Sequence, residues 1–361
     1  MRKKIVGLYD PYLDTFGGGE KHILSIIKVI CDHGCQPAIF WDENTDHEIK
    51  DILNLDFETK PIYYPNFFKS KKNCWEKIKI LSDIDYFFYV SDGSYFFSPA
   101  KINYVFLMIP DKNLFKFNII NKLKTFNYKF ITNSRFTQKK FLDFGLDTQV
   151  VYPYLDNDFI NLGLSHLVKE KIILSVGRFF KHLHSKRQDL AIKAFKKLKK
   201  NNPGFSDYQL ILVGGLKKED QDYINVLQQM IGNDKSISLK TNLRYDELLK
   251  LYQKSAFYWH FAGYGVDEKL NPEKVEHLGI SPLEAMASGC ITFCHRSGGP
   301  TEFIHDGMNG FLFKDIDELI NKITNIETDK EEQEKIKNLA KKTVGEKFSY
   351  DRFKNQVLSI L

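Results

Sequence analysis

The chain has 361 residues, of which 43% are hydrophobic and 27% are charged, so a disordered protein is excluded and two folded domains are expected. Its 52 basic residues exceed its 46 acidic residues by a margin too small for the footprint of a nucleic-acid-binding protein.

The first part of the chain alternates short apolar runs with helical patterns. An apolar run at residues 5–8 predicts a strand, a glycine-containing loop follows, and residues 20–33 have a helical pattern. Further strands are predicted at 38–41, 86–90, 102–108 and 129–132, with a helix over 134–144. This alternation is typical of a parallel sheet that is covered by helices.

A polar stretch at residues 156–166 interrupts this alternation, and we expect it to be irregular and to separate two domains. The alternation then starts again, with predicted strands at 172–176, 209–213, 236–239, 256–261 and 291–294 and helices over 188–200, 220–231, 245–254 and 282–288. The sequence therefore predicts an α/β fold of two doubly wound, Rossmann-like domains, residues 1–155 and 156–345. A binding site is expected in a cleft between them, at the carboxyl ends of the strands.

Two glutamates with seven residues between them, Glu276 and Glu284, mark the most informative stretch of the chain. Ser281 is a favourable N-cap and Pro282 a favourable first helical residue, so a helix is expected to begin there. The backbone amides of residues 279–281 would then face a diphosphate or sugar oxygens. Alternatively, Ser281 and Glu284 have the spacing of a capping box, in which Glu284 only accepts a hydrogen bond from the cap amide.

A basic pair follows the first predicted strand of the second domain. Arg178 comes directly after that strand, and Lys186 precedes the next helix. Fixed cations at the end of a strand could neutralise the charge that develops on a departing nucleoside diphosphate. The alternative is a solvated basic loop, which also carries His182 and His184, and for these two histidines a surface position is expected.

A glycine-rich turn follows the first predicted strand, where Gly17, Gly18 and Gly19 precede Glu20. Glycines at such a turn let a ligand approach the backbone, although any tight strand-to-helix turn uses glycines as well. The turn lacks the spacing Gly-x-Gly-x-x-Gly, so no dinucleotide cofactor is predicted and a Rossmann oxidoreductase is not favoured.

Taken together, these segments resemble the family 4 glycosyltransferases of the GT-B fold. The family signature is Glu, seven residues, Glu and then Ala-Met-Ala-x-Gly, and residues 276–289 match it without a gap. Weaker matches in the family's order extend over nearly the whole chain, including residues 132–137, 212–215 and 297–302. The resemblance implies two domains that face each other across a cleft, with the last helix, 346–361, crossing back onto the first domain.

The resemblance also implies roles for individual residues. Glu284 would bind the ribose hydroxyls of the donor nucleotide and Glu276 would lie near the donor sugar. Arg178 and Lys186 would stabilise the leaving diphosphate. Donor contacts are further implied for Gly279, Ile280, Ser281, Gly18, Gly19 and Gly214, with contact to the acceptor as the alternative for the glycine-rich turn. No metal and no cofactor would be required.

One departure from the family concerns histidine. Many relatives carry a histidine after a strand of the first domain, but residues 105–111 of this chain contain none. His260 instead ends a predicted strand of the second domain, where it could face the cleft or serve a structural role.

The sequence therefore predicts a retaining, metal-independent hexosyltransferase that uses a UDP- or GDP-hexose. Its acceptor would be a glycan, a lipid-linked molecule or another hydroxyl compound, and no nucleic acid is expected as a partner. The alternative is a catalytically degenerate nucleotide-binding subunit of a glycan-assembly complex.

The acceptor and the cellular location are less strongly indicated. The aromatic stretches at 86–89 and 95–97 could receive the acceptor, with buried strand core as the alternative for the first. The basic run at 69–72 is expected either to be solvated or to make weak peripheral contact with anionic lipid. No signal peptide or membrane span is predicted, so we expect a cytoplasmic protein, either free or at the inner face of a membrane.

Overall fold

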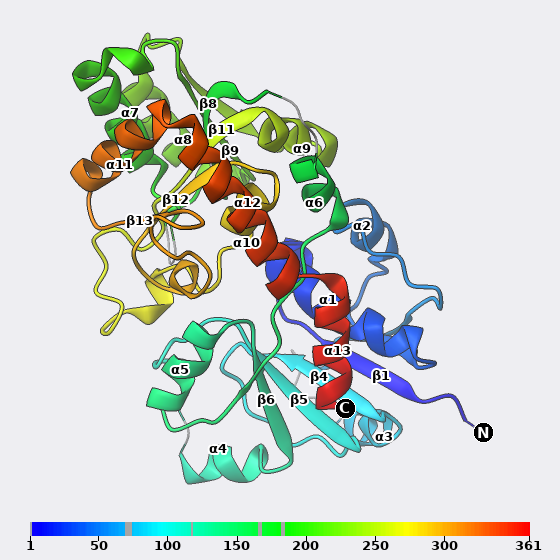
Figure 1. The fold of residues 1–361 in the computed structure, drawn as a ribbon. Coiled ribbons are helices and arrows are strands. Elements are labelled where there is room, and N and C mark those ends of the chain that lie inside the picture. The colour runs from blue at the N-terminus through cyan, green and yellow to red at the C-terminus, as the bar shows by residue number, and fades with distance from the viewer. Residues whose placement is uncertain (1, 69–73, 117, 165–167, 182–184) are drawn as a thin grey trace. The chain divides into compact units, whose positions relative to one another are not determined.

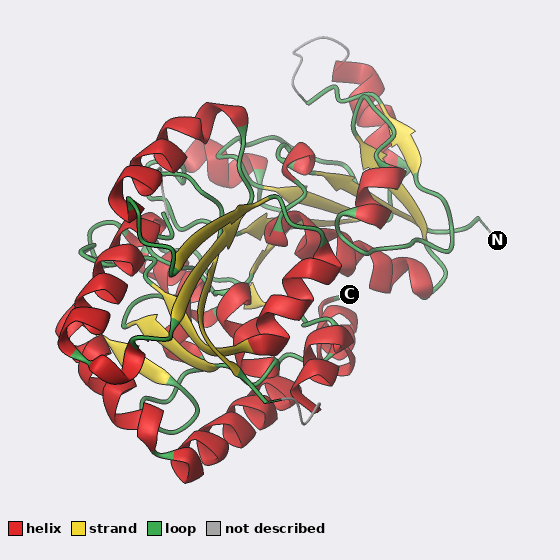
Figure 2. Cartoon of the chain, turned by 90° about the horizontal axis from the view of Figure 1, so that it is seen from above, coloured by secondary structure: helices red, strands yellow, loops and turns green. Residues whose placement is uncertain are grey.

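A computed structural model describes residues 2–68, 74–116, 118–164, 168–181 and 185–361 (Figure 1). The chain divides into two compact units. Unit 1 comprises Met1–Tyr154 together with Asp351–Leu361, and unit 2 comprises Leu155–Tyr350. In each unit the strands form a parallel sheet that lies among helices, as Figure 2 shows.

The sheet of unit 1 has the strand order β3-β2-β1-β4-β5-β6-β7. Its strands are β1 (Ile5–Tyr9), β2 (Gln36–Phe40), β3 (Ile62–Tyr64), β4 (Tyr86–Val90), β5 (Ile102–Leu107), β6 (Tyr128–Thr132) and β7 (Gln149–Val150). The central strands are buried on both faces, which explains why β4 is a continuous apolar run rather than an alternating pattern. The strand predicted at 86–90 is therefore confirmed with the same bounds.

The helices associated with unit 1 are α1 (Gly18–Asp32), α2 (Asp46–Asp51), α3 (Cys74–Ser82), α4 (Ile119–Lys124), α5 (Arg135–Asp143) and the last helix, α13 (Tyr350–Ile360). The hydroxyl of Tyr104 on β5 donates a hydrogen bond of 2.6 Å to the carbonyl oxygen of Ile360. The ring of His22 on α1 packs edge-on against Phe106, with centroids 4.9 Å apart, and lies 6.0 Å from Phe353 on α13. Helices α1 and α13 therefore cover the same face of this sheet.

The sheet of unit 2 has the order β10-β9-β8-β11-β12-β13. Its strands are β8 (Glu170–Val176), β9 (Gln209–Gly214), β10 (Ile237–Thr241), β11 (Ser255–His260), β12 (Ile291–His295) and β13 (Phe311–Phe313). Its helices are α6 (Asn157–Leu164), α7 (Gln188–Asn201), α8 (Gln221–Ile231), α9 (Tyr245–Lys254), α10 (Ile280–Ala287), α11 (Ile316–Thr328) and α12 (Lys330–Lys347). The core of this unit is strongly aromatic and includes the fully buried side chains of Trp259, Phe195 and Phe293.

One part of the predicted organisation is wrong. Residues 156–166 were expected to be irregular, but Asn157–Leu164 form helix α6. The cause is tertiary packing, because the buried ring of Phe159 lies edge-on against Tyr252 of α9 with a centroid separation of 5.3 Å. Contacts of this kind stabilise a short helix whose sequence is only weakly helical.

A search of the described helices finds none with the length and apolar character needed to cross a bilayer.

Candidate functional site

The beginning of helix α10 differs from the sequence prediction. Gly279, with a φ of 99°, is the N-cap, and Ile280 is the first helical residue. The prediction of Ser281 as N-cap and Pro282 as first helical residue is therefore wrong, because a left-handed glycine lets the chain enter the helix two residues earlier. Since Ser281 already lies inside the helix, the capping-box alternative for Glu284 is wrong as well.

The first turn of α10 exposes backbone donors. The first N–H groups of an α-helix have no partner within the helix, and no side chain of the described residues caps this one. Pro282 has no N–H, so the donors at this end come from Gly279, Ile280 and Ser281. Such a helix end attracts anionic oxygens. Donor binding by these three residues remains a prediction.

Ser281 also anchors the helix to the sheet. Its hydroxyl accepts a hydrogen bond of 2.9 Å from the hydroxyl of Tyr258 on β11 and lies 3.3 Å from the carbonyl oxygen of Val176, the last residue of β8. The start of α10 is therefore fixed against the carboxyl end of β8, the strand that precedes Arg178.

Glu284 is held by a buried tyrosine. The hydroxyl of Tyr252 donates a hydrogen bond of 2.7 Å to Oε2 of Glu284, and the Tyr252 side chain is fully buried. Burial, followed by the charge of Glu284, raises the pKa of Tyr252 well above its usual value. Tyr252 therefore stays protonated and orients the carboxylate as a hydrogen-bond donor. The sequence analysis did not find Tyr252, because its spacing on α9 looks like that of any core residue.

Glu276, Lys186 and His260 form a cluster around one carboxylate. Oε2 of Glu276 pairs with the ammonium group of Lys186 and accepts a hydrogen bond of 2.8 Å from Nε2 of His260. The side chains of Glu276 and Lys186 are 12% and 14% exposed, and that of His260 is 1% exposed. A carboxylate this deeply buried needs such partners, since an unpaired buried charge is costly.

His260 acts in this cluster as a neutral donor. Burial lowers the pKa of His260, and the hydrogen bond to Glu276 only partly opposes that effect. The neutral imidazole then carries its proton on Nε2, where the carboxylate accepts it. Its Nδ1 atom is buried and has no hydrogen-bond partner among the described residues. His260 is therefore buried, as the structural alternative required, and its partner is the predicted site residue Glu276.

Three glycines, Gly177, Gly298 and Gly299, allow the close packing around Lys186 and Glu276. A Cβ at Gly177 would lie 3.1 Å from Cδ and 3.2 Å from Cβ of Lys186, so the aliphatic part of Lys186 crosses the backbone where Gly177 has no side chain. A Cβ at Gly298 would overlap the carbonyl oxygen of Glu276. The amide of Gly299 donates a hydrogen bond of 2.7 Å to that same oxygen. The two glycines at 298 and 299 therefore fix the backbone of Glu276.

Arg178 and Gly214 lie at the carboxyl ends of the neighbouring strands β8 and β9. Arg178 follows β8, is exposed, and has its guanidinium carbon 5.1 Å from the centre of the Phe180 ring. Gly214 ends β9, where a Cβ would collide with the carbonyl group of Gly177. The close approach of β8 and β9 is a sufficient reason for glycine at 214. The predicted donor contacts of both residues remain predictions.

Gly18 and Gly19 lie in unit 1, at the start of α1. Gly17 is the N-cap, and its amide donates a hydrogen bond of 2.7 Å to Oε2 of Glu20. A Cβ at Gly19 would lie 2.5 Å from the sulfur of Met108, which follows β5. A side chain at position 19 would require Met108 to move, and a ligand contact at this turn stays a prediction.

Asp10 is an ionisable residue beside this turn that the sequence analysis missed. It follows β1, is 1% exposed, and its Oδ2 atom has no hydrogen-bond partner among the described residues. Burial, with a smaller contribution from the charge of Glu20, raises the pKa of Asp10 to about 8. An aspartate directly after a strand was visible in the sequence, but its burial was not.

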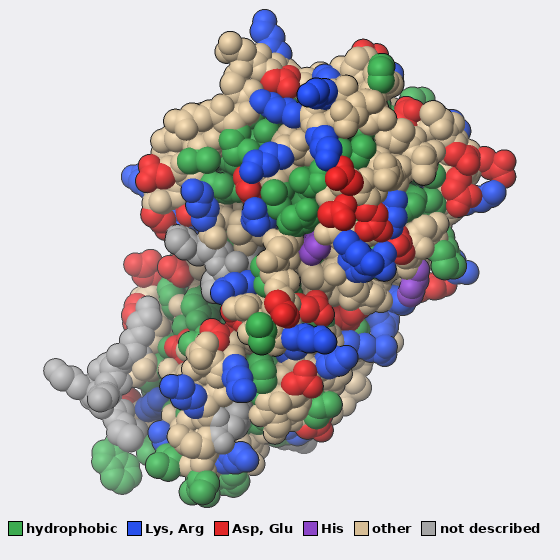
Figure 3. Space-filling model, turned by 90° about the vertical axis from the view of Figure 1, so that its left-hand side faces the viewer, with side chains coloured by type: hydrophobic (Ala, Val, Ile, Leu, Met, Phe, Trp, Pro, Cys, Tyr) green, Lys and Arg blue, Asp and Glu red, His purple; other side chains and the backbone are tan. Residues whose placement is uncertain are grey.

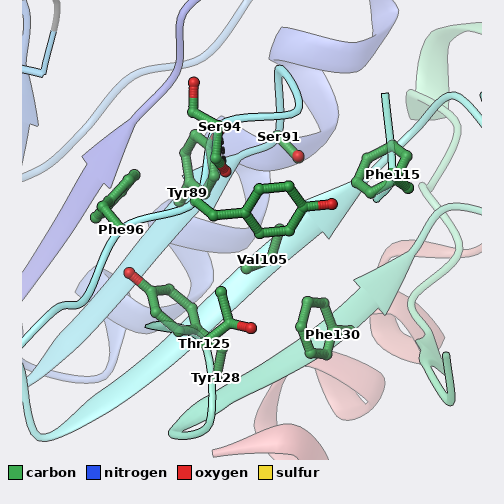
Figure 4. A pocket seen from close by; sticks show the side chains of 10 residues that line it. Tyr89, Ser91, Ser94, Phe96, Val105, Phe115, Thr125, Tyr128 and Phe130 are labelled. Atoms are coloured by element: carbon green, nitrogen blue, oxygen red, sulfur yellow. Dashed lines mark hydrogen bonds between the residues drawn. The ribbon is translucent and has the colours of Figure 1, made fainter. Parts of the chain in front are cut away.

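The aromatic stretches of unit 1 divide between core and pocket. Phe87 and Phe88 on β4 are fully buried, as the core alternative required. Tyr89 and Phe96 line a small pocket (Figure 4). The other lining residues are Ser91, Ser94, Tyr95, Val105, Phe115, Thr125, Tyr128 and Phe130. In this pocket the Tyr89 hydroxyl donates a hydrogen bond to the carboxylate of Asp92.

Two features of the sequence analysis lie outside the described residues. They are the basic run at 69–72 and the histidines His182 and His184.

Comparison with known proteins identifies the family. Residues 163–343, half of the chain, match the family model of the glycosyl transferases group 1. The chain belongs to this family. The matched region contains the cluster around Glu276, Arg178 and the whole of α10. It therefore covers the predicted site residues of unit 2.

Relatives of this group 1 glycosyl transferase agree with the assignment. The human GDP-Man:Man(3)GlcNAc(2)-PP-Dol alpha-1,2-mannosyltransferase is 31% identical over 192 residues, which are 50% of this chain and 36% of the relative. The chain spans about a third of the length of this relative and of its mouse counterpart, of which it covers 33%.

Solved structures share the fold along the whole chain. A glycosyltransferase from Rickettsia africae has a TM-score of 0.74 at 18% identity, with 99% of this chain and 97% of that chain covered. Anabaena Alr3699/HepE in complex with UDP and glucose has a TM-score of 0.71 at 19% identity, with 99% of each chain covered. The predicted α/β fold of the GT-B class is thereby confirmed.

Proposed function

We propose that this group 1 glycosyl transferase moves a hexose from a nucleotide sugar to an acceptor hydroxyl, with retention of configuration and without a metal ion. The observation that carries this proposal is the grouping of Glu276, Lys186 and Glu284 around the uncapped start of α10. An ammonium group and helix N–H donors suit a diphosphate, and an oriented carboxylate suits ribose hydroxyls.

The transfer breaks the bond between the anomeric carbon and the diphosphate, and the diphosphate leaves with the electron pair. Lys186, Arg178 and the first-turn amides of α10 would stabilise the negative charge that develops on it. These positive groups would supply the charge that a metal ion provides in other transferases, which supports a metal-independent reaction. The acceptor oxygen would bond to the anomeric carbon on the face from which the diphosphate leaves, which retains the configuration, and the proton of the acceptor hydroxyl would pass to the departing diphosphate.

Lys186 is already engaged before the donor binds. Its ammonium group pairs with Glu276, so a bound diphosphate would have to share it. His260 keeps its own hydrogen bond to Oε2 of Glu276 in that exchange. We propose that His260 thereby holds Glu276 in place beside the donor sugar when Lys186 turns toward the phosphate.

The names of the relatives indicate the chemical classes of the donor and the acceptor. The human and mouse relatives are named for GDP-Man and for Man(3)GlcNAc(2)-PP-Dol, and the Anabaena structure contains UDP and glucose. We therefore propose a UDP- or GDP-hexose as donor and a lipid-linked glycan as acceptor, used at the cytoplasmic face of a membrane. The Glu-x7-Glu signature of family 4 supports the same assignment.

The test is thermal stabilisation by UDP, GDP and their hexose derivatives in the presence of EDTA. A ligand that binds the folded state raises the melting temperature. We expect Glu284→Gln to weaken binding of the preferred nucleotide about tenfold, the effect of losing one charged hydrogen bond. A nucleotide that lacks both ribose hydroxyls should bind the variant and the wild type equally. Glu331→Gln, a change on the exposed face of α12, is the matched control.

Each outcome of this test is informative. Nucleotide binding followed by release of nucleoside diphosphate from the donor supports the transferase. Binding without any turnover on a panel of lipid-linked acceptors would support the degenerate nucleotide-binding subunit instead. Absence of stabilisation by every nucleotide would contradict both.

A further inference from the structure

The surface around helix α4 in unit 1 is unusually apolar. Six large hydrophobic side chains within residues 97–126 are between 42% and 78% exposed, and they come from α4 and from the segments that flank it. They are Phe97, Leu114, Ile119, Ile120, Leu123 and Phe126, which we call the α4 face. Clusters of exposed large apolar residues usually mark a binding surface.

Helix α4 is held at its ends rather than by its own apolar residues. The side chain of Asn118 caps it by accepting a hydrogen bond of 2.8 Å from the amide of Asn121. Thr125 closes it with hydrogen bonds from its amide to the carbonyl oxygens of Asn121 and Lys122. None of the six helical residues is buried. The apolar side chains of α4 are therefore not used by the fold.

The α4 face joins two separate segments. The rings of Phe97 and Phe126 stack with their centroids 6.0 Å apart and an interplanar angle of 10°. Their chain neighbours Phe96 and Thr125 line the pocket of Figure 4, so the face borders that pocket. Figure 3 shows exposed hydrophobic and basic side chains near one another on this side of the molecule.

Basic side chains outnumber acidic ones around the α4 face, where Asp111 lies beside Leu114. Lys112, Lys116, Lys122 and Lys124 are all exposed within or beside it, and residues 112–129 contain no aspartate or glutamate. The apolar side chains suit the outer acyl region of a bilayer, and the exposed lysines along the same segment suit its anionic headgroups. A second copy of the chain is a poor occupant, because it would bring a second set of lysines against the first.

We propose that the α4 face is a docking surface for an anionic lipid bilayer. The apolar side chains enter the headgroup region, and the four lysines contact lipid phosphates. This inference deepens the proposed function, since a lipid-linked acceptor would then be presented to unit 1 at the membrane surface. The basic run at 69–72, which was the earlier reason to expect membrane contact, is not needed for it.

The experiment is vesicle co-sedimentation of the full chain with phosphatidylglycerol and with phosphatidylcholine vesicles, without nucleotide. We expect binding to the anionic vesicles, and a loss of about tenfold or more in the double variant Ile120→Glu/Leu123→Glu, since two apolar contacts are replaced by charges that anionic lipid repels. The matched control is Ile52→Glu/Leu270→Glu, which alters two residues of similar exposure outside the α4 face. Melting temperatures verify that both variants fold.

Several results would overturn the proposal. They are failure of the wild type to bind phosphatidylglycerol vesicles, equal binding to phosphatidylcholine, and equal loss in both double variants. A fourth is a dimer of the wild type that the Ile120→Glu/Leu123→Glu variant abolishes, because the face would then bind a second copy. Stabilisation of the same variants by nucleotide is measured in parallel, so failure of membrane docking is distinguishable from failure of donor binding.

Discussion

Helices α1 and α10 both begin at a glycine N-cap and both carry a glutamate in the turns that follow, yet they begin in different ways. In α1 the carboxylate of Glu20 returns to the amide of Gly17, so the helix caps itself. In α10 the carboxylate of Glu284 is held by Tyr252, and the helix end is left without a side-chain cap from the described residues. The comparison shows that the glutamate satisfies the N-cap amide in α1 and is held by another residue in α10, while neither start has a side-chain cap among the described residues.

The charges around the two helix starts differ as well. Beside α1, the buried Asp10 and Glu20 are both acidic, and the charge of Glu20 raises the pKa of Asp10. Beside α10, Glu276 is matched by Lys186. Contact of the glycine-rich turn of unit 1 with donor phosphate or with acceptor stays a prediction.

The largest effect is expected from removing the cation beside α10. Lys186→Ala should lower kcat/KM for sugar transfer by about a hundredfold or more, because a fixed positive group no longer faces the leaving diphosphate. The measurement is release of nucleoside diphosphate at saturating acceptor. Lys193→Ala, on the exposed face of α7, should leave the rate unchanged. A rate within twofold of the wild type in Lys186→Ala would remove Lys186 from the reaction.

The backbone that holds Glu276 gives the second prediction. Gly298→Ala should cost about 2–4 kcal/mol of unfolding free energy, since the new Cβ meets the carbonyl oxygen of Glu276 and the φ of 63° is unfavourable for alanine. Gly307→Ala is the control, because Gly307 has a φ of 78° but nothing within 4 Å of a Cβ, so it should cost only about 1–2 kcal/mol. Urea denaturation measures both. Equal losses would show that backbone strain, not the contact with Glu276, explains the glycine.

The third prediction concerns pH, where the two units should respond in opposite ways. Between the ordinary pKa of an aspartate, 3.8, and about 8, Asp10 is protonated when folded and ionised when unfolded. The unfolded state then binds fewer protons, so the contribution of Asp10 to stability falls as pH rises through this window. Burial lowers the pKa of His277 in unit 2 from 6.5 to about 4, so its contribution is full above 6.5 and is lost as pH falls toward 4.

Asp10→Asn separates these two trends. At pH 8 the variant should be more stable than the wild type by up to about 5 kcal/mol, and the difference should vanish below pH 4. Unfolding free energies measured between pH 4 and pH 8 test this, with the exposed Asp143→Asn on α5 as control. A wild type whose stability at pH 8 equals that of Asp10→Asn would mean that Asp10 is ionised in the folded protein at little cost.

The smallest effect is expected at the self-capped helix. Glu20→Ala should cost about 1 kcal/mol of unfolding free energy, because the amide of Gly17 loses its partner. Glu20→Gln retains an acceptor and should lose less. Nucleotide binding should be unchanged in both, in contrast to Glu284→Gln. A loss of nucleotide binding in Glu20→Ala would show that the start of α1 is a donor site after all.

The sequence predicted the strands and helices best where a whole element is buried and therefore apolar along its length. The apolar run of β4 predicted its own bounds because both faces of that strand are buried. Local signals failed where tertiary contacts dominate. Ser281 and Pro282 resemble a helix start, but the left-handed Gly279 moves the start earlier, and α6 depends on the packing of Phe159.

The sequence predicted which residues form the candidate site but not which of them contact one another. The sequence motifs named Lys186 and Glu276, which are 90 residues apart, without showing that they pair. His260 was noticed, but its hydrogen bond to Glu276 depends on where β11 ends relative to the following loop. Tyr252 and Asp10 were missed because burial, which gives each of them its chemical character, leaves no local pattern.

The division of unit 1 between the two ends of the chain has a consequence for biosynthesis. Helix α13 is translated after the whole of unit 2, yet its Ile360 carbonyl is the acceptor for Tyr104 and its Phe353 packs on His22. During translation, the face of the unit 1 sheet that α13 covers therefore stays without α13 while nearly two hundred residues of unit 2 are made. Unit 2 emerges as an unbroken segment and is able to fold first, which reverses the order in which the units begin to appear.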